Sequence, residues 1–376
     1  MIRNAYRYDF GGGERFPVDN SVVLKDLGYD TVVVSSSPKL LAYANEQGIK
    51  SVKGIWWSRQ NWGGWRTILL PIYLLWQLVL FFWYIGLLLR TKPDVVHIQS
   101  RDDFIAGTLA SRFLGKRVVW TDHADLKYIY ANYPIWYKNL IGKLVFGCSK
   151  LAHCVSMVSK SEQKLVTAAL GKSLPSNHKV IYNGVSSKPI KKVSRPTNAQ
   201  KDIIFACSSR LVVTKGIGEL IEAFILAQKT LPETRLYLFG EGPDENKFKL
   251  LANDNRRIEF KGFPDNALAQ IADCDVFVHP SYHEGFSISL VEATKLGLPV
   301  IACDVGGNSE IIRNNVNGLL VPSKDAEALS KAMTNLAANK QLRAKLSKAS
   351  EETYKRDFIL EDIIKEQFLP IYEGPK

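Results

Sequence analysis

Two glutamates, Glu284 and Glu292, stand where an apolar run gives way to a helical pattern. Gly285 between them allows the backbone to approach a ligand closely, and a helix that begins near Phe286 and Ser287 leaves its first amides without partners. Such amides attract phosphate or other anionic oxygens, whereas carboxylates accept hydrogen bonds from hydroxyl groups. Together these residue types predict a binding site for a nucleotide sugar.

A cationic loop precedes this stretch in the chain. Arg210 and Lys215 lie between a predicted strand and a predicted helix, with Gly216 directly after them. A planar guanidinium and a compact ammonium suit the several oxygens of a diphosphate, although an isolated pair of this kind is more often a solvated surface feature. The loop, the Glu284 junction and the Gly306-Gly307 turn should all follow strands of one parallel sheet. We therefore favour a binding function for all three.

The elements that must position these residues alternate between strand and helix in two blocks. Residues 1–185 and 202–350 each show this alternation, and the basic, proline-containing stretch at 186–201 between them has the composition of a linker. Residues 351–376 are helical in pattern. We expect two Rossmann-like α/β domains, with their ligands at the C-terminal ends of the strands.

The first block offers two weaker site candidates. Gly12 and Gly13 lie in a glycine-rich turn between a loosely alternating strand at 1–10 and a helix, and surface turns use the same residues. His123 lies just past the C-terminal end of a predicted strand at 117–121. A lone histidine is more often structural, but this one lies where parallel sheets place their ligands.

Residues 68–89 form the most apolar segment, in which Gln77 is the only clearly polar side chain. Roughly 20 such residues could span a bilayer. A span would, however, separate the strands predicted at 31–35 and 94–98, which should share a sheet, and Pro71 and Gly86 interrupt the run. We favour a helix or helical hairpin that contacts one leaflet, with a buried crossover helix and a true span as alternatives.

The composition is that of a soluble globular protein with an excess of positive charge. The formal net charge of +12 favours an anionic partner such as nucleic acid, a membrane surface or a phosphorylated substrate. Five cysteines without a C-x-x-C pair, and an N-terminus without an apolar signal core, indicate a cytoplasmic protein with reduced thiols.

The motifs resemble those of family 4 of the retaining glycosyltransferases, which have the GT-B fold. The resemblance is most specific in 203–322, where Glu284 and Glu292 form the family's E-x7-E pattern. It rests there on Arg210…Lys215-Gly216, Gly240-Glu241-Gly242, PSYHEGFSISLVEATKLGLPVIACDVGG and EIIRNNVNGLLVP. It is looser in 1–185, where it rests on GGGER, DVVHIQS, TDHAD and VIYNGV.

The resemblance implies two domains that face each other across a cleft, with a C-terminal helix that crosses back to the first domain. It implies that Arg210 and Lys215 hold the donor diphosphate and that Glu292 holds the ribose. Glu284 and His123 would orient the transferred sugar as the catalytic residues. The other substrate-binding residues would be Gly12, Gly13, Gly216, Glu241 and the backbone amides of Gly285, Phe286 and Ser287. No metal and no organic cofactor are implied.

We therefore predict a metal-independent, hexosyltransferase-type enzyme that uses a UDP-sugar or GDP-sugar as its donor. The expected acceptor is lipid-linked or a glycan, in envelope or exopolysaccharide synthesis, and nucleic acid is not an expected partner. The hydrophobic segment and the positive charge predict peripheral attachment to the inner face of the cell membrane. The alternatives are a GT-B epimerase or phosphorylase, and a non-catalytic membrane-binding scaffold.

Overall fold

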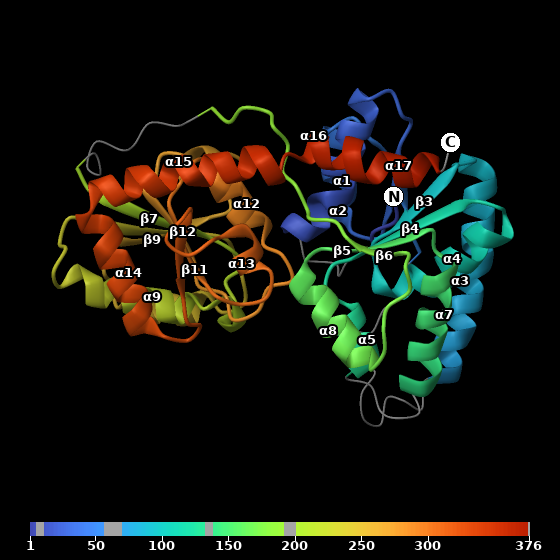
Figure 1. Ribbon diagram of the computed structural model, residues 1–376, viewed down its shortest axis with the longest axis horizontal. Helices are drawn as coiled ribbons and strands as arrows, with labels where there is room; N and C mark the ends of the chain where they lie inside the picture. Colours follow the sequence, from blue (N-terminus) through green and yellow to red (C-terminus); the bar gives the residue numbers. More distant parts are fainter. Residues whose placement is uncertain (5–10, 56–69, 132–137, 192–200, 375–376) are drawn as a thin grey trace. The chain divides into compact units, whose positions relative to one another are not determined.

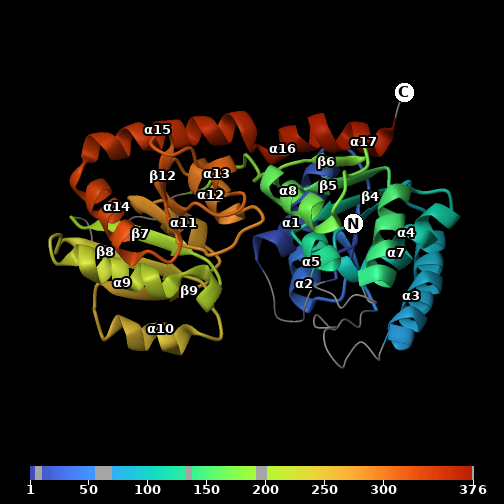
Figure 2. The ribbon, with the colours of Figure 1, turned by 60° about the horizontal axis from the view of Figure 1, so that its bottom comes forward.

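The computed structural model describes residues 1–4, 11–55, 70–131, 138–191 and 201–374. The chain forms two compact units (Figure 1). The first contains Met1–Ser186 together with Leu360–Lys376, and the second contains Ser187–Ile359. Each unit has a parallel sheet with helices on its faces (Figure 1, Figure 2), so the prediction of an α/β protein with two Rossmann-like halves is confirmed.

The sheet of the first unit is assembled around Ile2. Its strands are β1 (Val32–Ser35), β2 (Lys50–Lys53), β3 (Val95–Ile98), β4 (Arg117–Asp122), β5 (Cys154–Met157) and β6 (His178–Val180). Ile2 forms parallel bridges to Val34 of β1 and to Ile98 of β3, so the order is β2-β1-Ile2-β3-β4-β5-β6. The strands predicted at 31–35 and 94–98 therefore do share a sheet. We predicted a strand at 1–10. The structure describes residues 1–4 of it, in which Ile2 forms these bridges, and residues 5–10 lie outside the described ranges.

Helices cover this sheet, and the end of the chain returns to it. They are α1 (Gly12–Asp26), α2 (Pro38–Glu46), α3 (Leu70–Thr91), α4 (Phe104–Phe113), α5 (Leu126–Ala131), α7 (Lys143–Leu151), α8 (Lys160–Leu170), α16 (Leu360–Ile363) and α17 (Leu369–Glu373). Arg117 Nε donates to the carbonyl of Ile371 at 2.6 Å, and His97 Nδ1 lies 2.8 Å from the Tyr372 hydroxyl. These contacts fix α17 beside β3 and β4.

The apolar segment forms one uninterrupted helix, α3, and the helical hairpin that we considered is wrong. Pro71 is tolerated because it lies in the first turn, where a backbone amide needs no partner, and Gly86 stays helical. In the described part of the chain, α3 is the one helix long and apolar enough to cross a membrane by length and composition. Residues 68 and 69, and the tryptophan-rich stretch before them, lie outside the description.

One face of α3 packs against α4 (Figure 2). Its buried side chains are Leu70, Tyr73, Gln77, Leu80, Tyr84 and Leu88. Gln77 Nε2 donates to the carbonyl of Asp102 at 2.9 Å, and the Tyr84 hydroxyl donates to Asp103 Oδ1 at 2.7 Å. These polar contacts fix the rotation of the helix, so that its other face points away from the protein.

The second unit contains a six-stranded parallel sheet. Its strands are β7 (Ile203–Ser208), β8 (Thr234–Phe239), β9 (Ile258–Gly262), β10 (Val276–His279), β11 (Val300–Cys303) and β12 (Gly318–Val321). Its helices are α9 (Ile217–Gln228), α10 (Glu245–Ala252), α11 (Ala267–Ile271), α12 (Ile288–Lys295), α13 (Asn308–Ile311), α14 (Ala326–Ala338) and α15 (Lys340–Asp357). α15 continues through 351, where we expected a separate C-terminal helix to begin.

The order of this sheet, β12-β11-β10-β7-β8-β9, places the first and fourth strands of the unit side by side. Phe205 of β7 pairs with Val276 of β10. The sheet continues from this pair in opposite directions, and the carboxyl ends of such a strand pair are where parallel sheets place their ligands. Both loops carry residues of the predicted donor site.

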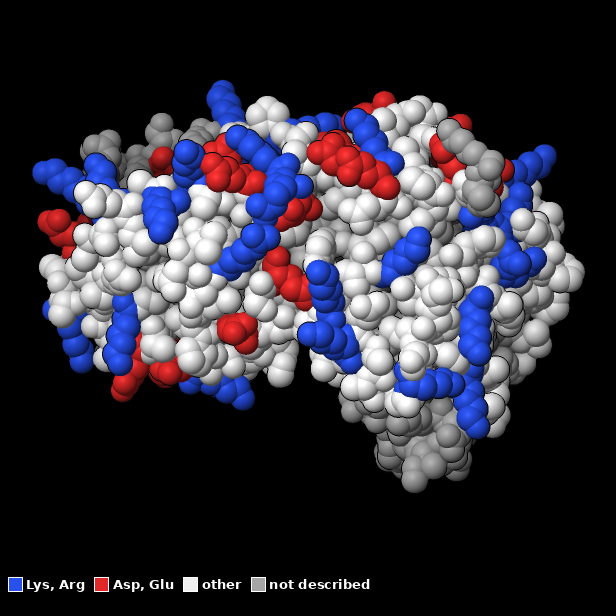
Figure 3. All heavy atoms as spheres, viewed as in Figure 1, with Lys and Arg blue, Asp and Glu red and all other residues white. Residues whose placement is uncertain are grey.

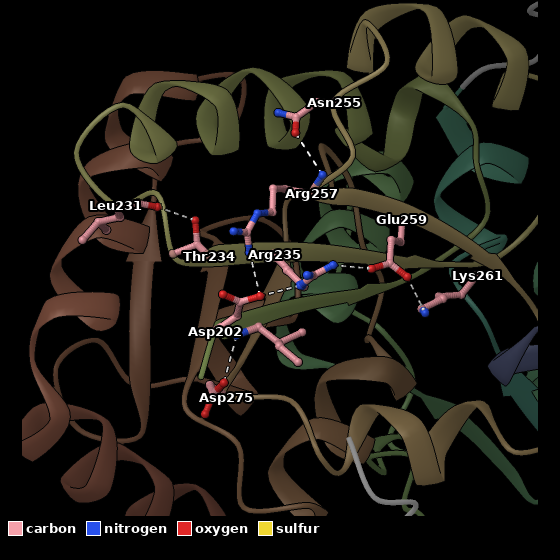
Figure 4. Close-up of polar contacts among 10 residues, drawn as sticks. Asp202, Leu231, Thr234, Arg235, Asn255, Arg257, Glu259, Lys261 and Asp275 are labelled. Carbon is pink, nitrogen blue, oxygen red and sulfur yellow. Dashed lines mark hydrogen bonds and ion pairs between the residues drawn. The ribbon is translucent and has the colours of Figure 1, made fainter. Parts of the chain in front are cut away.

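An ion network holds the opposite end of the sheet (Figure 4). Asp202 accepts hydrogen bonds from Arg235 Nε at 2.5 Å and from a terminal nitrogen of Arg257 at 2.6 Å. Glu259 pairs with Arg235 at 3.1 Å and with Lys261 at 2.7 Å. Asp202, Arg235 and Arg257 lie near the starts of β7, β8 and β9, at the end of the sheet away from the predicted donor loops, so we assign this network to the stability of the unit.

Candidate functional site

The centre of the site in the second unit is an ion pair between the two loops. After β7 the chain makes a short 3-10 turn, Val213–Lys215, and then enters α9 through Gly216. Lys215 Nζ lies 2.6 Å from Glu284 Oε1, and the Nε2 atom of His279, the last residue of β10, lies 2.9 Å from the same oxygen. Two residues that the sequence placed on separate loops are thus in direct contact.

Two glycines make this close approach possible. Gly216 has φ +67°, and a Cβ atom added there would lie 2.0 Å from the carbonyl oxygen of Pro280. Gly306 has φ +53°, and its added Cβ would lie 1.7 Å from the carbonyl oxygen of Glu284. Any side chain would clash with backbone and would also be strained at these φ values. The backbone of the Glu284 loop therefore rests directly on both glycines.

Tyr282 ties the same two loops together. Its backbone amide donates to the carbonyl of Thr214 at 3.0 Å, and its hydroxyl donates to the carboxylate of Glu219 in the first turn of α9. Tyr282 thus attaches the Glu284 loop to the start of α9 through one backbone and one side-chain hydrogen bond. These bonds restrict the positions that Lys215 and Glu284 can take relative to each other.

The environment of Glu284 keeps it ionised. Burial alone would raise the pKa of this carboxyl, but the hydrogen bond and charge of His279, together with Lys215, outweigh it and hold the pKa well below its ordinary value. An ionised carboxylate only accepts hydrogen bonds. Glu284 is therefore suited to hold a hydroxyl group and unsuited to act as a general acid.

α12 starts directly after this loop and presents its N-terminus there. Ser287 caps the helix, because its hydroxyl accepts a hydrogen bond from the amide of Leu290 at 3.3 Å. The Phe286 side chain is buried and packs edge to face against Phe358, with ring centres 5.8 Å apart. Gly285 and Phe286 can thus offer a ligand only their backbone. Glu292 lies half-buried within α12.

Arg210 and Glu241 lie on the loops that follow β7 and β8. Both side chains are exposed, and the Glu241 carbonyl accepts the amide of Leu211 at 2.9 Å, which holds the loop after β8 against the loop after β7. The structure brings Lys215 and Glu284 into direct contact beside Gly216, and it places Arg210 and Glu241 on the loops after β7 and β8 and Glu292 within α12.

The first unit holds a second cluster, around His123. The imidazole follows β4 and packs edge to face on Phe16, with ring centres 5.4 Å apart, and its Nε2 lies 3.4 Å from Gln99 Oε1. Gly12 and Gly13 begin α1, and a Cβ added to Gly13 would lie 4.0 Å from His123 Nδ1. The sheet edge thus brings together three of the predicted residues.

The same environment keeps His123 neutral. Burial, then the charge of Arg3, then His97 lower the pKa of His123 well below its ordinary value. A neutral imidazole has one donor and one acceptor nitrogen. It can orient hydroxyl groups on a sugar, which is the role predicted from the resemblance.

Sequence reasoning missed two residues of these clusters. Arg3 follows the Ile2 bridge, and its guanidinium donates to the Gln99 carbonyl and, at 3.3 Å, to Glu14. His279 is the last residue of a buried strand. A histidine at the C-terminal end of a parallel strand is the pattern that pointed to His123, and the same pattern could have pointed to His279.

The candidate site in the second unit combines a lysine, an ionised carboxylate and the N-terminus of α12. In the ranges that the structure describes, no group of three or more histidine, cysteine, aspartate or glutamate side chains is arranged to hold a metal ion. The charged groups nearest to the start of α12 suit an anionic ligand with hydroxyl groups attached.

Two family models match the chain in sequence. One, described as Glycosyltransferase Family 4, matches residues 10–188, and the other, described as Glycosyl transferases group 1, matches residues 190–353. Together the two models extend over both units.

Individual proteins resemble the chain over different lengths. The alpha-monoglucosyldiacylglycerol synthase of Acholeplasma laidlawii is 26% identical, over 87% of this chain and 85% of the synthase. The lipopolysaccharide core biosynthesis glycosyltransferase LpsE of Rhizobium meliloti is 33% identical, over 41% of this chain and 45% of LpsE. The structure of Anabaena HepE in complex with UDP and glucose has a TM-score of 0.76 at 20% identity, over 100% of this chain and 99% of HepE. HepE has the same fold.

Proposed function

Because the chain belongs to family 4 of the glycosyltransferases and has their GT-B fold, we propose that it moves a sugar from a nucleoside diphosphate to an acceptor hydroxyl with retention of configuration. The observation that carries this proposal is the Lys215–Glu284 pair, 2.6 Å apart, beside the N-terminus of α12. A cation and free amides suit the diphosphate, and an ionised carboxylate suits the sugar. Each half of a nucleotide sugar thus has a matching group.

In the proposed reaction the bond between the sugar and the diphosphate breaks, and a bond to the acceptor oxygen forms on the same face. Lys215, Arg210 and the first amides of α12 stabilise the negative charge that develops on the leaving diphosphate. The acceptor proton passes to the departing phosphate oxygen. Glu284 and His123 hold the sugar in position, and Glu292 holds the ribose. With cations and amides in this role, the reaction proceeds without a metal ion.

We further propose that the enzyme lies on the inner face of the cell membrane and that its acceptor is lipid-linked. Support comes from the face of α3 that points away from α4. Its exposed side chains include Ile72, Leu75, Val79, Phe82 and Leu89, and Leu75 and Phe82 are 62% and 64% exposed. The first four of these lie two positions, about 200°, after buried residues of the same helix. Core packing explains the buried stripe, and a membrane surface explains the exposed one.

Charge in the same unit also suits an anionic lipid surface. Arg90 and Lys92 are exposed at the C-terminal end of α3, and Lys143 and Lys150 are exposed on α7. Lys and Arg gather over α7 on the face seen in Figure 3, where this view shows no Asp or Glu. Basic groups beside an apolar surface strengthen binding to anionic leaflets. Two relatives fit this setting by name, a glycolipid synthase and a lipopolysaccharide core enzyme.

The function is tested with the purified full chain, a panel of UDP-sugars and GDP-sugars, and a membrane lipid extract as acceptor. We expect one nucleotide sugar to release its nucleoside diphosphate only when lipid is present, and the product to keep the donor's anomeric configuration. Release without any acceptor would indicate an epimerase instead. A chain that binds and cleaves none of the donors would contradict the proposal and favour the scaffold alternative.

A further inference from the structure

His279 is held more rigidly than the other groups at the Glu284 loop. It is the last residue of β10, its side chain is 3% exposed, and it pairs in register with Ala302 of β11. A side chain on a central, buried strand cannot move without disturbing the sheet. Glu284 and Lys215, by contrast, lie on loops.

The contact between His279 and Glu284 fixes the hydrogen position. His279 Nε2 lies 2.9 Å from Glu284 Oε1. A carboxylate can only accept, so Nε2 carries the hydrogen and donates it. His279 Nδ1 is buried and has no partner among the described residues. Since Nδ1 has no acceptor to bond in the described part of the chain, the contact with Glu284 is what places a hydrogen on Nε2.

Glu284 Oε1 has a second partner that the donor would remove. Lys215 Nζ lies 2.6 Å from this oxygen and is also the cation assigned to the diphosphate. A diphosphate carries more negative charge than one carboxylate and therefore attracts Lys215 more strongly. Once Lys215 turns to the diphosphate, His279 remains as the partner of Glu284 Oε1 among the described residues, and Oε2 is left to accept a sugar hydroxyl.

We propose that His279 is a positioning residue, whose Nε2–H keeps the Glu284 carboxylate oriented toward the transferred sugar when Lys215 binds the diphosphate. This inference rests on the proposed function. It predicts that loss of the imidazole impairs steps that involve the sugar and spares binding of the nucleoside diphosphate alone. A histidine that only fills space in the core would impair folding and both kinds of binding together.

The tautomer is tested without any nucleotide. Histidine-selective 15N labelling and long-range 1H–15N correlation spectra report which ring nitrogen carries hydrogen, and His279→Gln assigns the signal. We expect the Nε2–H form at neutral pH, and a shift of its resonance in Glu284→Gln. An Nδ1–H tautomer, or a resonance that does not respond to Glu284→Gln, would overturn the inference whatever the donor proves to be.

The role is tested with three variants of the full chain, with UDP and UDP-glucose as probes. His279→Leu is expected to lower kcat about 100-fold, because a displaced orienting group costs this much. Its Kd for UDP should stay within about two-fold of the wild type. His279→Gln keeps an N–H near the Nε2 position and should recover kcat to within about 10-fold.

Ser281→Ala is the matched control. Ser281 lies in the same loop and is buried, and its hydroxyl donates one hydrogen bond, to the carbonyl of His283. Its kcat should match the wild type. If His279→Leu keeps wild-type kcat, or loses UDP binding in parallel with kcat, His279 has no positioning role. If the wild type itself binds no nucleoside diphosphate, the proposed function fails, and the tautomer measurement still decides the His279–Glu284 contact.

Discussion

Lys215 Nζ lies 2.6 Å from Glu284 Oε1, so the cation assigned to the donor diphosphate is neutralised by the carboxylate assigned to the donor sugar. The pair couples the two halves of the donor site. A ligand that draws Lys215 away changes the surroundings of Glu284, and removal of Glu284 frees Lys215. Substitution of either residue should therefore have a different effect on the nucleoside diphosphate and on the nucleotide sugar.

Lys215→Ala should weaken UDP binding about 10-fold to 100-fold, the value of one hydrogen bond to a charged group. The variant loses a phosphate contact, and Glu284 keeps only His279 of its two partners at Oε1. The rate of sugar transfer should therefore fall together with the affinity for UDP. Titration calorimetry measures the affinity, and Lys229→Ala, an exposed lysine just beyond the other end of α9, is the control. Equal UDP affinity in wild type and Lys215→Ala would remove Lys215 from the site.

Glu284→Gln should move binding and catalysis in opposite directions. The neutral amide no longer competes for Lys215, so UDP should bind about 10-fold more tightly. The rate of sugar transfer should fall, because the ionised acceptor for the sugar hydroxyl is gone. The two quantities are measured on one preparation, by calorimetry and by release of nucleoside diphosphate. Weaker binding of UDP would show that the pair does not restrain Lys215.

The sequence predicted the alternation of elements because buried parallel strands appear as short apolar runs, as in β7, β10 and β11. It missed β2 and α2, since β2 is an edge strand with exposed lysines and little apolar pattern. The sequence also did not predict that Ile2 joins β1 to β3. It does so through backbone hydrogen bonds, which any residue type can form.

Residue types at the donor site were predictable, but their pairing was not. Glu284 and Lys215 stand out in the sequence as charges beside glycines, but the contact between them spans 69 positions of chain. It depends on the register of β7 with β10 and on Gly216 and Gly306, which bring the backbones together. The position of His279 after an apolar run could have marked it as a site candidate, as it did for His123, but its contact with Glu284 appears only in the structure.

Gly216→Ala should destabilise the second unit, and Gly218→Ala should not. At position 216 the new Cβ meets the Pro280 carbonyl and φ is +67°, whereas at 218 the nearest atom is Leu251 Cδ2 at 3.7 Å. A non-glycine residue at such a φ costs about 1–2 kcal/mol before the clash is counted, which lowers Tm by roughly 5 °C or more. Differential scanning calorimetry of both variants tests this. Similar Tm values would contradict the close packing.

Asp202→Asn should destabilise the second unit in a pH-dependent way. Burial alone would raise the pKa of Asp202. The hydrogen bonds from Arg235 and Arg257 outweigh burial, so the pKa of Asp202 is below its ordinary value. A carboxyl of this kind stabilises the fold above its unfolded pKa of about 4 and loses this effect as pH falls through the lower folded pKa. We expect a difference of about 1–3 kcal/mol at pH 7.

That difference in the stability of wild type and Asp202→Asn should shrink as the pH falls below about 4, the ordinary pKa of aspartate, toward the lower folded pKa. Thermal melts of both proteins at pH 7 and at the acid end measure it. Asp265→Asn, an exposed aspartate of the same unit, controls for the change of charge and should show little effect at either pH. A difference that is the same at both pH values would mean that the network in Figure 4 does not depend on the ionised carboxylate.

Leu75→Ser combined with Phe82→Ser should release the chain from anionic vesicles. Both side chains are exposed on α3, so the fold loses little, whereas a membrane would lose the burial of two large apolar groups. Each is worth about 1.5–3 kcal/mol when fully buried, so partitioning should fall about 100-fold or more. Sedimentation with phosphatidylglycerol vesicles measures it, and added salt should weaken wild-type binding by screening the basic groups.

Leu250→Ser is the matched control for this experiment, because Leu250 is 81% exposed but lies on α10 of the second unit. It should sediment like the wild type. If the wild type does not sediment, or if Leu250→Ser is released as readily as the α3 variant, the exposed stripe of α3 is not a membrane-binding surface. Sugar transfer to a short, water-soluble acceptor should survive in the α3 variant, because the Lys215–Glu284 pair lies in the other unit.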